Sequence, residues 1–246
     1  MDALSPLQIG YFVVILIVSF SLRGSAGFGG LNGPLLMVVL PAKVVVPALV
    51  FLGILSSAAI VVRDYRHILW SAVRQTLPYG IAGTAAGIFL FDALETQELE
   101  KGLGVFILFY GLYSLWCLVH RPKPFNVAPG IIAGVMGTTS GVIGTMFGAL
   151  AGIFVAMFLD ILRLDKRTFR VTMAATLMLM GIARAGGYVS VGAVTEEVAI
   201  IIVAALPLMG IGVVLGNRLH TGLDQMGFSR LIGLLFVVIG GFLFLR

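Results

Sequence analysis

Four apolar segments without a single charged side chain constrain the fold of this chain more than any other feature. They cover residues 44–62, 103–119, 198–215 and 231–245. Each approaches or reaches the roughly 20 residues that a helix needs to span the hydrocarbon core of a bilayer. Lipid satisfies no backbone N–H or C=O group, so a spanning segment must be a helix or a strand of a closed barrel. The alternating pattern of barrel strands is absent, and we therefore predict an all-α polytopic membrane protein.

The composition also indicates that the chain is embedded in a lipid bilayer. With 59% hydrophobic residues, 11% charged residues and a mean hydropathy of +1.10, the chain has too few polar side chains to cover a globule in water. Residues 7–22 lack a basic flank and a small-residue cleavage site, so we expect a retained helix. The single cysteine, Cys117, excludes an intramolecular disulfide and offers no metal cluster. We expect one transmembrane domain over residues 1–246, with no metal, no cofactor and no nucleic-acid partner.

The basic residues predict which connections face the cytoplasm. Eleven of the sixteen Lys and Arg residues fall in or beside four regions: Arg63, Arg66 and Arg74; Arg121 and Lys123; Arg163, Lys166, Arg167 and Arg170; Arg218 and Arg230. Cytoplasmic loops of membrane proteins carry such an excess of positive charge. Residues 92–101 and 191–197 are acidic and poor in Lys and Arg, so we expect them on the outer side. The net charge of +5 is thus explained by topology.

The sequence also contains an internal repeat. The segment LPYGIAGTAAG, from Leu77, aligns without gaps with LPLMGIGVVLG, from Leu206. Further along in the same register, Lys101 lies over Arg230. A weaker alignment places the glycine motif of residues 26–30 over residues 140–144. We predict two homologous halves, repeat 1 (residues 1–120) and repeat 2 (residues 127–246), joined by a polar turn.

Charge and repeat together predict that the two halves are inverted. The basic regions 120–126 and 160–170 are both expected in the cytoplasm, so residues 127–159 must form a hairpin, re-entrant or fully spanning. Three crossings follow it, at about 171–190, 198–217 and 230–245. By the repeat, residues 7–42 form the matching hairpin, followed by crossings at 44–62, 68–91 and 101–119. This gives about eight to ten membrane segments in two inverted repeats, with both termini outside. Inverted repeats with broken helices are typical of secondary transporters.

The residues left inside the membrane favour an anionic ligand. Every Asp, Glu and His is expected in a loop or at a helix end, whereas Arg23 and Arg184 fall within membrane segments. We expect helix breaks at the two glycine motifs, where free N–H groups, close backbone approach and arginine suit a multi-oxygen anion. Pro34 is suited to the first turn of a new helix. The candidate substrate-binding residues are Arg23, Ser25, Gly27, Phe28, Gly29, Gly30, Asn32, Thr139, Ser140, Gly141, Gly144, Thr145 and Arg184.

The same residues also fit structural roles. Glycines in membrane helices commonly serve as packing surfaces, which is the expected role of the Gly83/Gly87 pair. Arg23 and Arg184 could instead extend to the membrane interface.

The glycine and proline pattern resembles that of the TauE/SafE family of sulfite exporters. The first half shows Gly27-Phe28-Gly29-Gly30 before Pro34-Leu35-Leu36, followed later by Pro78, Gly83 and Gly87. The second half shows a glycine motif at 141–144, then Pro207, Gly212, Gly216 and Arg230. In the second motif, Thr145-Met146-Phe147 stands where glycines are expected, and Gly148 where the proline is expected. The resemblance implies a transporter of the bacterial cytoplasmic membrane for sulfite, sulfonates or related sulfur anions.

We therefore expect a non-enzymatic secondary transporter that moves sulfite, sulfoacetate or another organosulfonate by alternating access. The alternatives are an anion channel, a carrier of a different small organic anion and a non-catalytic membrane subunit. The sequence leaves direction, coupling ion and oligomeric state open.

Overall fold

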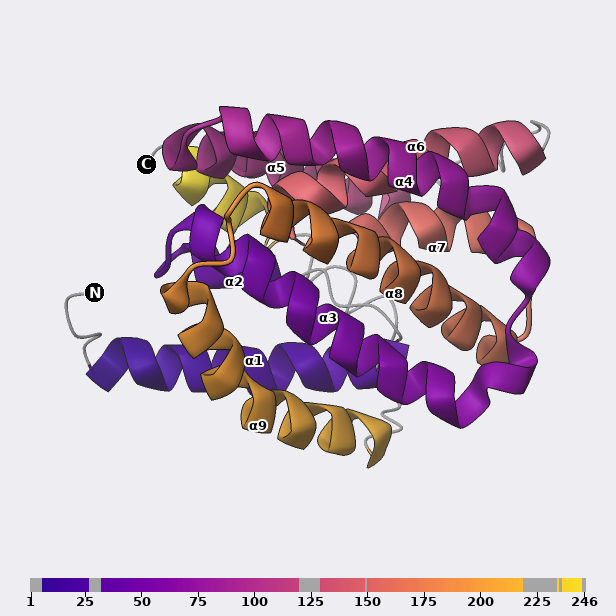
Figure 1. Ribbon diagram of the computed structural model, residues 1–246, viewed down its shortest axis with the longest axis horizontal. Helices are drawn as coiled ribbons and strands as arrows, with labels where there is room; N and C mark the ends of the chain where they lie inside the picture. The colour runs from indigo at the N-terminus through magenta and orange to yellow at the C-terminus, as the bar shows by residue number, and fades with distance from the viewer. Residues whose placement is uncertain are drawn as a thin grey trace.

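The computed structural model describes residues 6–26, 32–119, 129–148, 150–218, 234 and 236–244, and this part of the chain is all-helical. The helices are α1 (Pro6–Ala26), α2 (Asn32–Met37), α3 (Ala42–Asp64), the 3-10 helix η1 (Tyr65–His67), α4 (Trp70–Ala93), α5 (Thr96–Val119), α6 (Pro129–Phe147), α7 (Ala151–Ile161), α8 (Lys166–Ser190) and α9 (Glu196–Arg218). Residues 236–244 form a further helical segment. Figure 1 shows the long helices running roughly side by side. The predicted all-α class is confirmed for these residues.

The apolar segments of the sequence became long helices. Within the described residues, three helices are long and apolar enough to cross a membrane by length and composition: Ala42–His67, Gly130–Phe147 and Glu196–Leu215. Two shorter apolar helices, Gly10–Ser21 and Ala151–Ile161, belong to α1 and α7. Helices α1 and α2 lie in the range of the first predicted hairpin, and α6 and α7 lie in that of the second. The count of eight to ten membrane segments stays a prediction.

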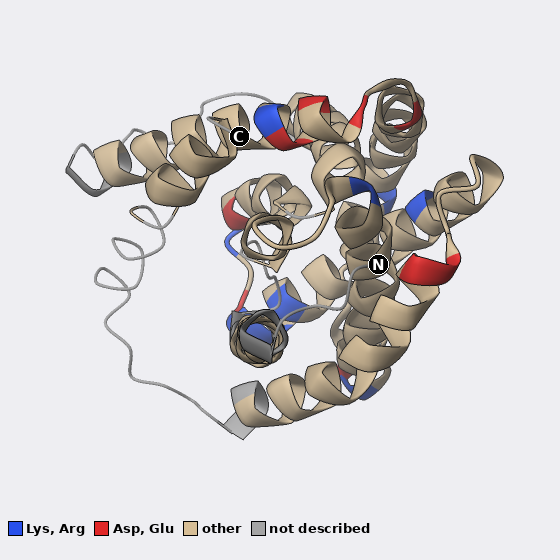
Figure 2. Cartoon of the chain, turned by 90° about the vertical axis from the view of Figure 1, so that its left-hand side faces the viewer, with Lys and Arg blue, Asp and Glu red and all other residues tan. Residues whose placement is uncertain are grey.

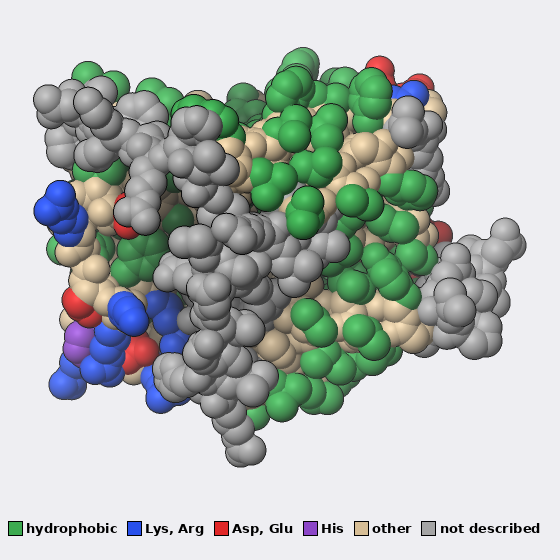
Figure 3. Space-filling model, turned by 180° about the vertical axis from the view of Figure 1, so that it is seen from behind, with side chains coloured by type: hydrophobic (Ala, Val, Ile, Leu, Met, Phe, Trp, Pro, Cys, Tyr) green, Lys and Arg blue, Asp and Glu red, His purple; other side chains and the backbone are tan. Residues whose placement is uncertain are grey.

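Large apolar side chains cover the outside of the helix bundle. The side chain of Phe89 is 73% exposed, and those of Val203 and Val238 are each 68% exposed. Figure 3 shows hydrophobic side chains spread along the length of one face. A water-soluble monomer rarely exposes so much contiguous apolar surface, whereas lipid tails cover it without cost. The surface therefore agrees with a multi-pass membrane protein.

Basic side chains gather at one end of the bundle. Arg167 Nε, from the start of α8, donates to Asp64 Oδ1 at the end of α3 over 2.8 Å. This bond places the α3–α4 and α7–α8 connections at the same end, as the charge pattern predicted. Figure 3 shows Lys, Arg and His clustered there, and Figure 2 views the bundle from its opposite end. Which membrane face this basic end occupies stays a prediction.

The core pairs each half of the chain with the other half. Helix α3 packs against α8, α4 packs against α6 and α8, and α9 packs against α1 and α3. Helices α3 and α8 are antiparallel, because Ile54 lies beside Gly181 while Asp64 lies beside Arg167. Helices α4 and α6 are parallel, because Gly137 lies beside Thr76 and a Cβ at Gly87 would lie 2.7 Å from Thr145 Cβ.

Helix α6 has a glycine face that packs closely on α4. Gly134, Gly137 and Gly141 recur every three or four residues, which places them on one side of a helix. A Cβ at Gly141 would lie 2.7 Å from Thr84 N, and a Cβ at Gly83 would overlap the backbone of Thr138. Small residues let membrane helices approach backbone to backbone, where dispersion stabilises the pair. The packing role expected for Gly83 agrees with this contact.

The start of α8 is fixed by an N-cap. The Asp165 carboxylate accepts hydrogen bonds from Arg167 N over 3.0 Å and from Thr168 N over 3.1 Å. Hydrogen bonds from the side chain and the backbone of Thr168 lower the pKa of Asp165. Caps of this type satisfy N–H groups that the first turn of a helix leaves free.

We expect Asp165→Ala to lower the melting temperature in detergent at pH 7, whereas Asp165→Asn retains most of the cap. Because the folded-state pKa is lowered, the carboxylate stabilises the fold fully above its unfolded pKa of about 3.9. That contribution is lost as the pH falls through the folded-state pKa. The melting temperatures of wild type and Asp165→Ala should therefore converge in acid. A gap that persists unchanged in acid contradicts this role for the carboxylate charge.

Candidate functional site

The second hairpin turns at the end of its glycine motif. We expected the helix to break within the second glycine motif, residues 137–148, and α6 continues to Phe147 before α7 begins at Ala151. The turn uses two left-handed residues, Gly148 with φ of +65° and Leu150 with φ of 67°. The turn thus lies at the end of the motif, because Gly141 and Gly144 serve close helix packing and leave the helix intact. A leucine in this conformation costs about 1–2 kcal/mol, so the surrounding packing must hold the turn.

Packing around the turn is tight. Leu150 is buried, and a Cβ at Gly148 would lie 3.0 Å from Val46 Cα on α3. The turn therefore rests against a helix of the other half of the chain. The break between α6 and α7 is a packed structural feature of the bundle interior.

Arg184 lies beside this hairpin. Its residue is 5% exposed, and its Nη2 donates to the Ser140 carbonyl over 3.0 Å. Its Nε is buried without a hydrogen-bond partner among the described residues. The ion pair between Arg167 and Asp64 does not include Arg184. A buried arginine that lacks a carboxylate partner is costly unless something else compensates its charge.

Glycine lets the guanidinium approach the hairpin backbone. A Cβ at Gly144 would lie 2.5 Å from Arg184 Nη2 and 2.5 Å from the Ala151 Cβ at the start of α7. Ser140 Oγ donates to the Ala151 carbonyl over 2.9 Å, which ties α6 to α7 across the break. The N-terminus of α7 carries partial positive charge from its free N–H groups. The guanidinium and this helix terminus together form a cationic region inside the bundle.

Two buried aromatic rings close the region toward one end of the bundle. Tyr188 follows Arg184 by one turn of α8, and its hydroxyl donates to the Thr145 carbonyl. The rings of Tyr188 and Phe91 meet edge to face, with centroids 5.0 Å apart. Beyond them, Lys43 Nζ lies 6.0 Å from the centroid of the Phe91 ring. Arg184 is thus separated by this aromatic pair from the end of the bundle where α4 meets α5.

One carboxylate is more buried than the sequence suggested. Glu100 is 7% exposed near the start of α5, and its Oε1 accepts from Ala42 N over 3.3 Å. This bond satisfies an N–H group in the first turn of α3, as a capping acid does. Glu100 therefore has a structural partner of its own.

Of the predicted residues, Ser140, Gly144, Thr145 and Arg184 come together at this site. Thr145 Oγ1 donates to the Gly141 carbonyl over 2.6 Å, so its hydroxyl serves α6 itself. The Cβ position of Gly141 faces α4, and Thr139 is half-buried.

In the first predicted hairpin, the structure describes Asn32 and Pro34. Asn32 begins α2 and is 3% exposed, and its Oδ1 has no partner among the described residues. Pro34 lies in the first turn of α2, as predicted. Gly27, Phe28, Gly29 and Gly30 lie outside the described residues, as do the side chains of Arg23 and Ser25. Their roles stay predictions.

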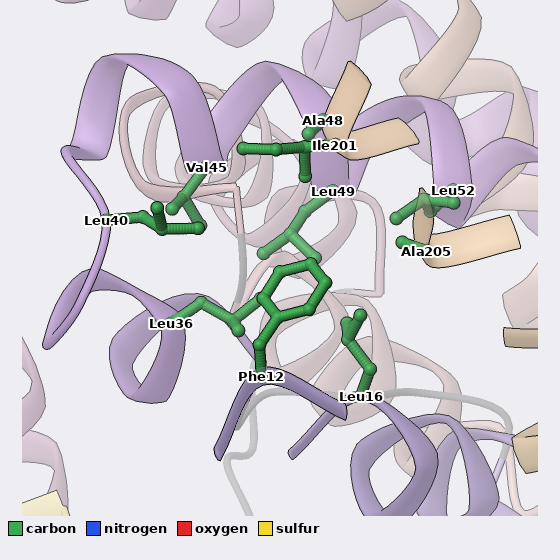
Figure 4. Close-up of a pocket in the computed structure, with 10 residues that line it drawn as sticks. All are labelled: Phe12, Leu16, Leu36, Leu40, Val45, Ala48, Leu49, Leu52, Ile201 and Ala205. Carbon is green, nitrogen blue, oxygen red and sulfur yellow. The ribbon is translucent and has the colours of Figure 1, made fainter. Parts of the chain in front are cut away.

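A separate hollow between α1, α2, α3 and α9 does not suit an anion. Figure 4 shows its lining, in which Phe12, Leu36 and Leu49 point toward one another. The full lining is Phe12, Leu16, Leu36, Leu40, Val45, Ala48, Leu49, Leu52, Ile201 and Ala205, all apolar. An oxyanion needs hydrogen-bond donors to replace its water, and these side chains provide none.

Sequence reasoning missed Tyr188 and Phe91. Both lie in apolar stretches where aromatic residues are ordinary core, so their types gave no signal. The spacing of Tyr188 from Arg184 places both on one face of a helix, and this spacing could have indicated that Tyr188 lies near the site.

The fold and the site define a multi-pass helical membrane protein with a cationic region between its helices. Comparison with protein families shows a match of residues 11–243 to the sulfite exporter TauE/SafE family, and the chain belongs to that family. No curated protein and no solved structure matches the chain. The family is a transporter family, and membership identifies a membrane transport protein of the sulfite and anion exporter class.

Proposed function

We propose that the protein is a secondary transporter that moves a small sulfur oxyanion, either sulfite or an organosulfonate, and that Arg184 holds the charge of this anion. The observation that carries the proposal is the buried guanidinium whose Nε lacks a partner among the described residues. Family membership independently supports an anionic substrate containing sulfur.

The chemistry around Arg184 suits an oxyanion. Arginine binds oxygen atoms through several N–H groups in one plane, and charge-assisted hydrogen bonds strengthen where water is excluded. The absence of a side chain at Gly144 lets the guanidinium lie against the hairpin backbone, and the N-terminus of α7 adds partial positive charge. A substrate bound here would compensate a charge that is otherwise costly to bury.

The pattern of helix contacts supports two inverted repeats, residues 1–120 and 127–246. Under the repeat, α4 corresponds to α9, α3 to α8 and α1 to α6. The contact of α4 with α6 then has its counterpart in α9 with α1, and that of α4 with α8 in α9 with α3. Helix α3 meets its own counterpart α8 in an antiparallel pair, as an axis in the membrane plane requires. Such repeats commonly rock against each other to expose a central site to either side.

A thermal-shift screen of sulfite, sulfate, sulfoacetate, taurine and chloride on the purified protein tests the ligand class. A ligand that binds only the folded state raises the melting temperature, and 100-fold saturation corresponds to about 2.7 kcal/mol. We expect sulfite or a sulfonate to stabilise the protein and chloride to have little effect. Stabilisation by none of the sulfur anions contradicts the proposed substrate class.

A further inference from the structure

Thr84 on α4 carries a buried hydroxyl that the fold does not use. The residue is 3% exposed, and its Oγ1 has no hydrogen-bond partner among the described residues. Buried hydroxyl groups in proteins almost always have a partner, so an unpaired one calls for a reason.

Other buried threonines of this bundle behave differently. The hydroxyls of Thr76, Thr145 and Thr176 each donate to the carbonyl four residues earlier, over 2.9, 2.6 and 2.9 Å. This local bond satisfies a hydroxyl within a helix without help from another element. Thr84 lies on the same kind of helix but forms no such bond to Gly80, so its hydroxyl is free to serve a group outside α4.

The register of α4 and α8 places Thr84 at the level of Arg184. A Cβ at Gly80 would overlap the Met180 side chain, and a Cβ at Gly187 would lie 2.5 Å from Ile88 Cγ1. On α4, Thr84 lies one turn after Gly80 and one turn before Ile88. On α8, Arg184 lies one turn after Met180. Residues four apart share a face of a helix. The contacts at 80 and 88 therefore bracket Thr84 opposite Arg184.

Helix α6 contacts both Thr84 and Arg184. Gly141 Cα lies against Thr84, since a Cβ there would be 2.7 Å from Thr84 N, and the preceding Ser140 carbonyl accepts from Arg184 Nη2 over 3.0 Å. The free hydroxyl of α4 and the free Nε of α8 thus flank the same pair of residues on α6. Two unpaired buried donors at one level of three packed helices are unlike the rest of the described interior.

We propose that Thr84 is a second binding residue of the anion site: its hydroxyl donates to one oxygen of the oxyanion while Arg184 holds another. This inference rests on the proposed function and deepens it. Two donors on separate helices match an anion with several oxygens, such as sulfite or a sulfonate, better than a monatomic halide. Thr84 therefore contributes to selectivity, whereas Arg184 contributes most of the attraction to charge.

The test compares Thr84→Val, which removes the hydroxyl at nearly constant shape, with Thr84→Ser, which keeps it. Thr76→Val, on the same helix with a locally satisfied hydroxyl, is the matched control. We measure the Kd of sulfite by calorimetry, the competition by chloride and the melting temperature without ligand. Thr84→Val should raise the sulfite Kd about 10-fold, as expected for one hydrogen bond to a charged group. Thr84→Ser and Thr76→Val should keep a Kd close to that of wild type.

Ligand-free stability separates binding from structure. Thr84→Val should melt no lower than wild type without ligand, because no hydrogen bond of the fold is lost, and chloride competition should be unchanged. Thr84→Ala serves as the second variant if the valine protein does not accumulate. An unchanged sulfite Kd in Thr84→Val or Thr84→Ala overturns the inference, as does an equal loss in Thr76→Val. If wild type binds sulfite and Arg184→Ala binds it far more weakly, such a result overturns the role of Thr84 alone. If wild type binds no sulfur oxyanion, the proposed function fails and the role of Thr84 fails with it.

Discussion

Arg184→Ala should weaken sulfite binding about 100-fold while leaving the protein folded in detergent. The variant removes a charge and at least one charge-assisted hydrogen bond, each of which contributes about 1.5–3 kcal/mol to a charged contact. A loss of about 2.7 kcal/mol corresponds to 100-fold in Kd. Arg184→Lys should be intermediate, because lysine keeps the charge but lacks the planar fork of donors. Calorimetric titration with sulfite measures all three proteins.

The control for this experiment is Arg66→Ala. Arg66 is exposed at the basic end of the bundle and stacks on its neighbour Tyr65, with the guanidinium 5.7 Å from the ring centroid. Its removal lowers the net charge equally but leaves the proposed site intact. Equal Kd values for wild type and Arg184→Ala, or an equal loss in Arg66→Ala, would show that Arg184 has no specific role in binding.

Gly83→Ala should destabilise the protein strongly, although it adds only one methyl group. A Cβ at Gly83 would overlap the Thr138 carbonyl and lie 3.0 Å from Thr138 Cα, so two helix backbones must separate. Overpacking of this kind costs about 1–3 kcal/mol. The melting temperature in detergent should fall accordingly.

Glycines with open surroundings provide the comparison. A Cβ at Gly186 or at Gly210 would meet no atom within 4 Å. Alanine is the better helix former by about 1 kcal/mol, so Gly186→Ala and Gly210→Ala should melt at or above the wild-type temperature. If all three variants shift the melting temperature by the same amount, the close α4–α6 contact is not what stabilises the bundle.

Helix positions were predictable because lipid makes their sequence signal simple. A segment such as residues 44–62 has no charge and must satisfy its backbone internally, so its conformation follows from composition alone. The same reasoning identified Arg184 as unusual, because a charge in such a segment has to be explained. These features depend on one residue or one segment and not on its neighbours in space.

The turn of the second hairpin could not be located in this way. Glycine serves both a positive φ and a close backbone approach, and the sequence does not say which. At Gly141 and Gly144 the structure uses close approach, and at Gly148 it uses the left-handed conformation. Leu150 also adopts positive φ, which its residue type argues against. Whether a glycine serves close approach or a positive φ depends on how α3 and α4 pack against α6.

The role of Thr84 likewise depends on three helices at once. In the sequence it is one of several threonines in apolar surroundings, where a bond to the carbonyl four residues earlier is the ordinary expectation. The missing bond and the register with α8 are properties of the folded chain.

Counterflow of labelled sulfite into liposomes preloaded with unlabelled sulfite tests the central claim most directly. Liposomes containing the wild-type protein should show saturable counterflow, and those containing Arg184→Ala should show far less at a sulfite concentration near the wild-type Kd. Arg66→Ala should retain counterflow. Non-saturating, voltage-driven current from wild type would indicate a channel, and equal counterflow in wild type and Arg184→Ala would contradict an anion site centred on Arg184.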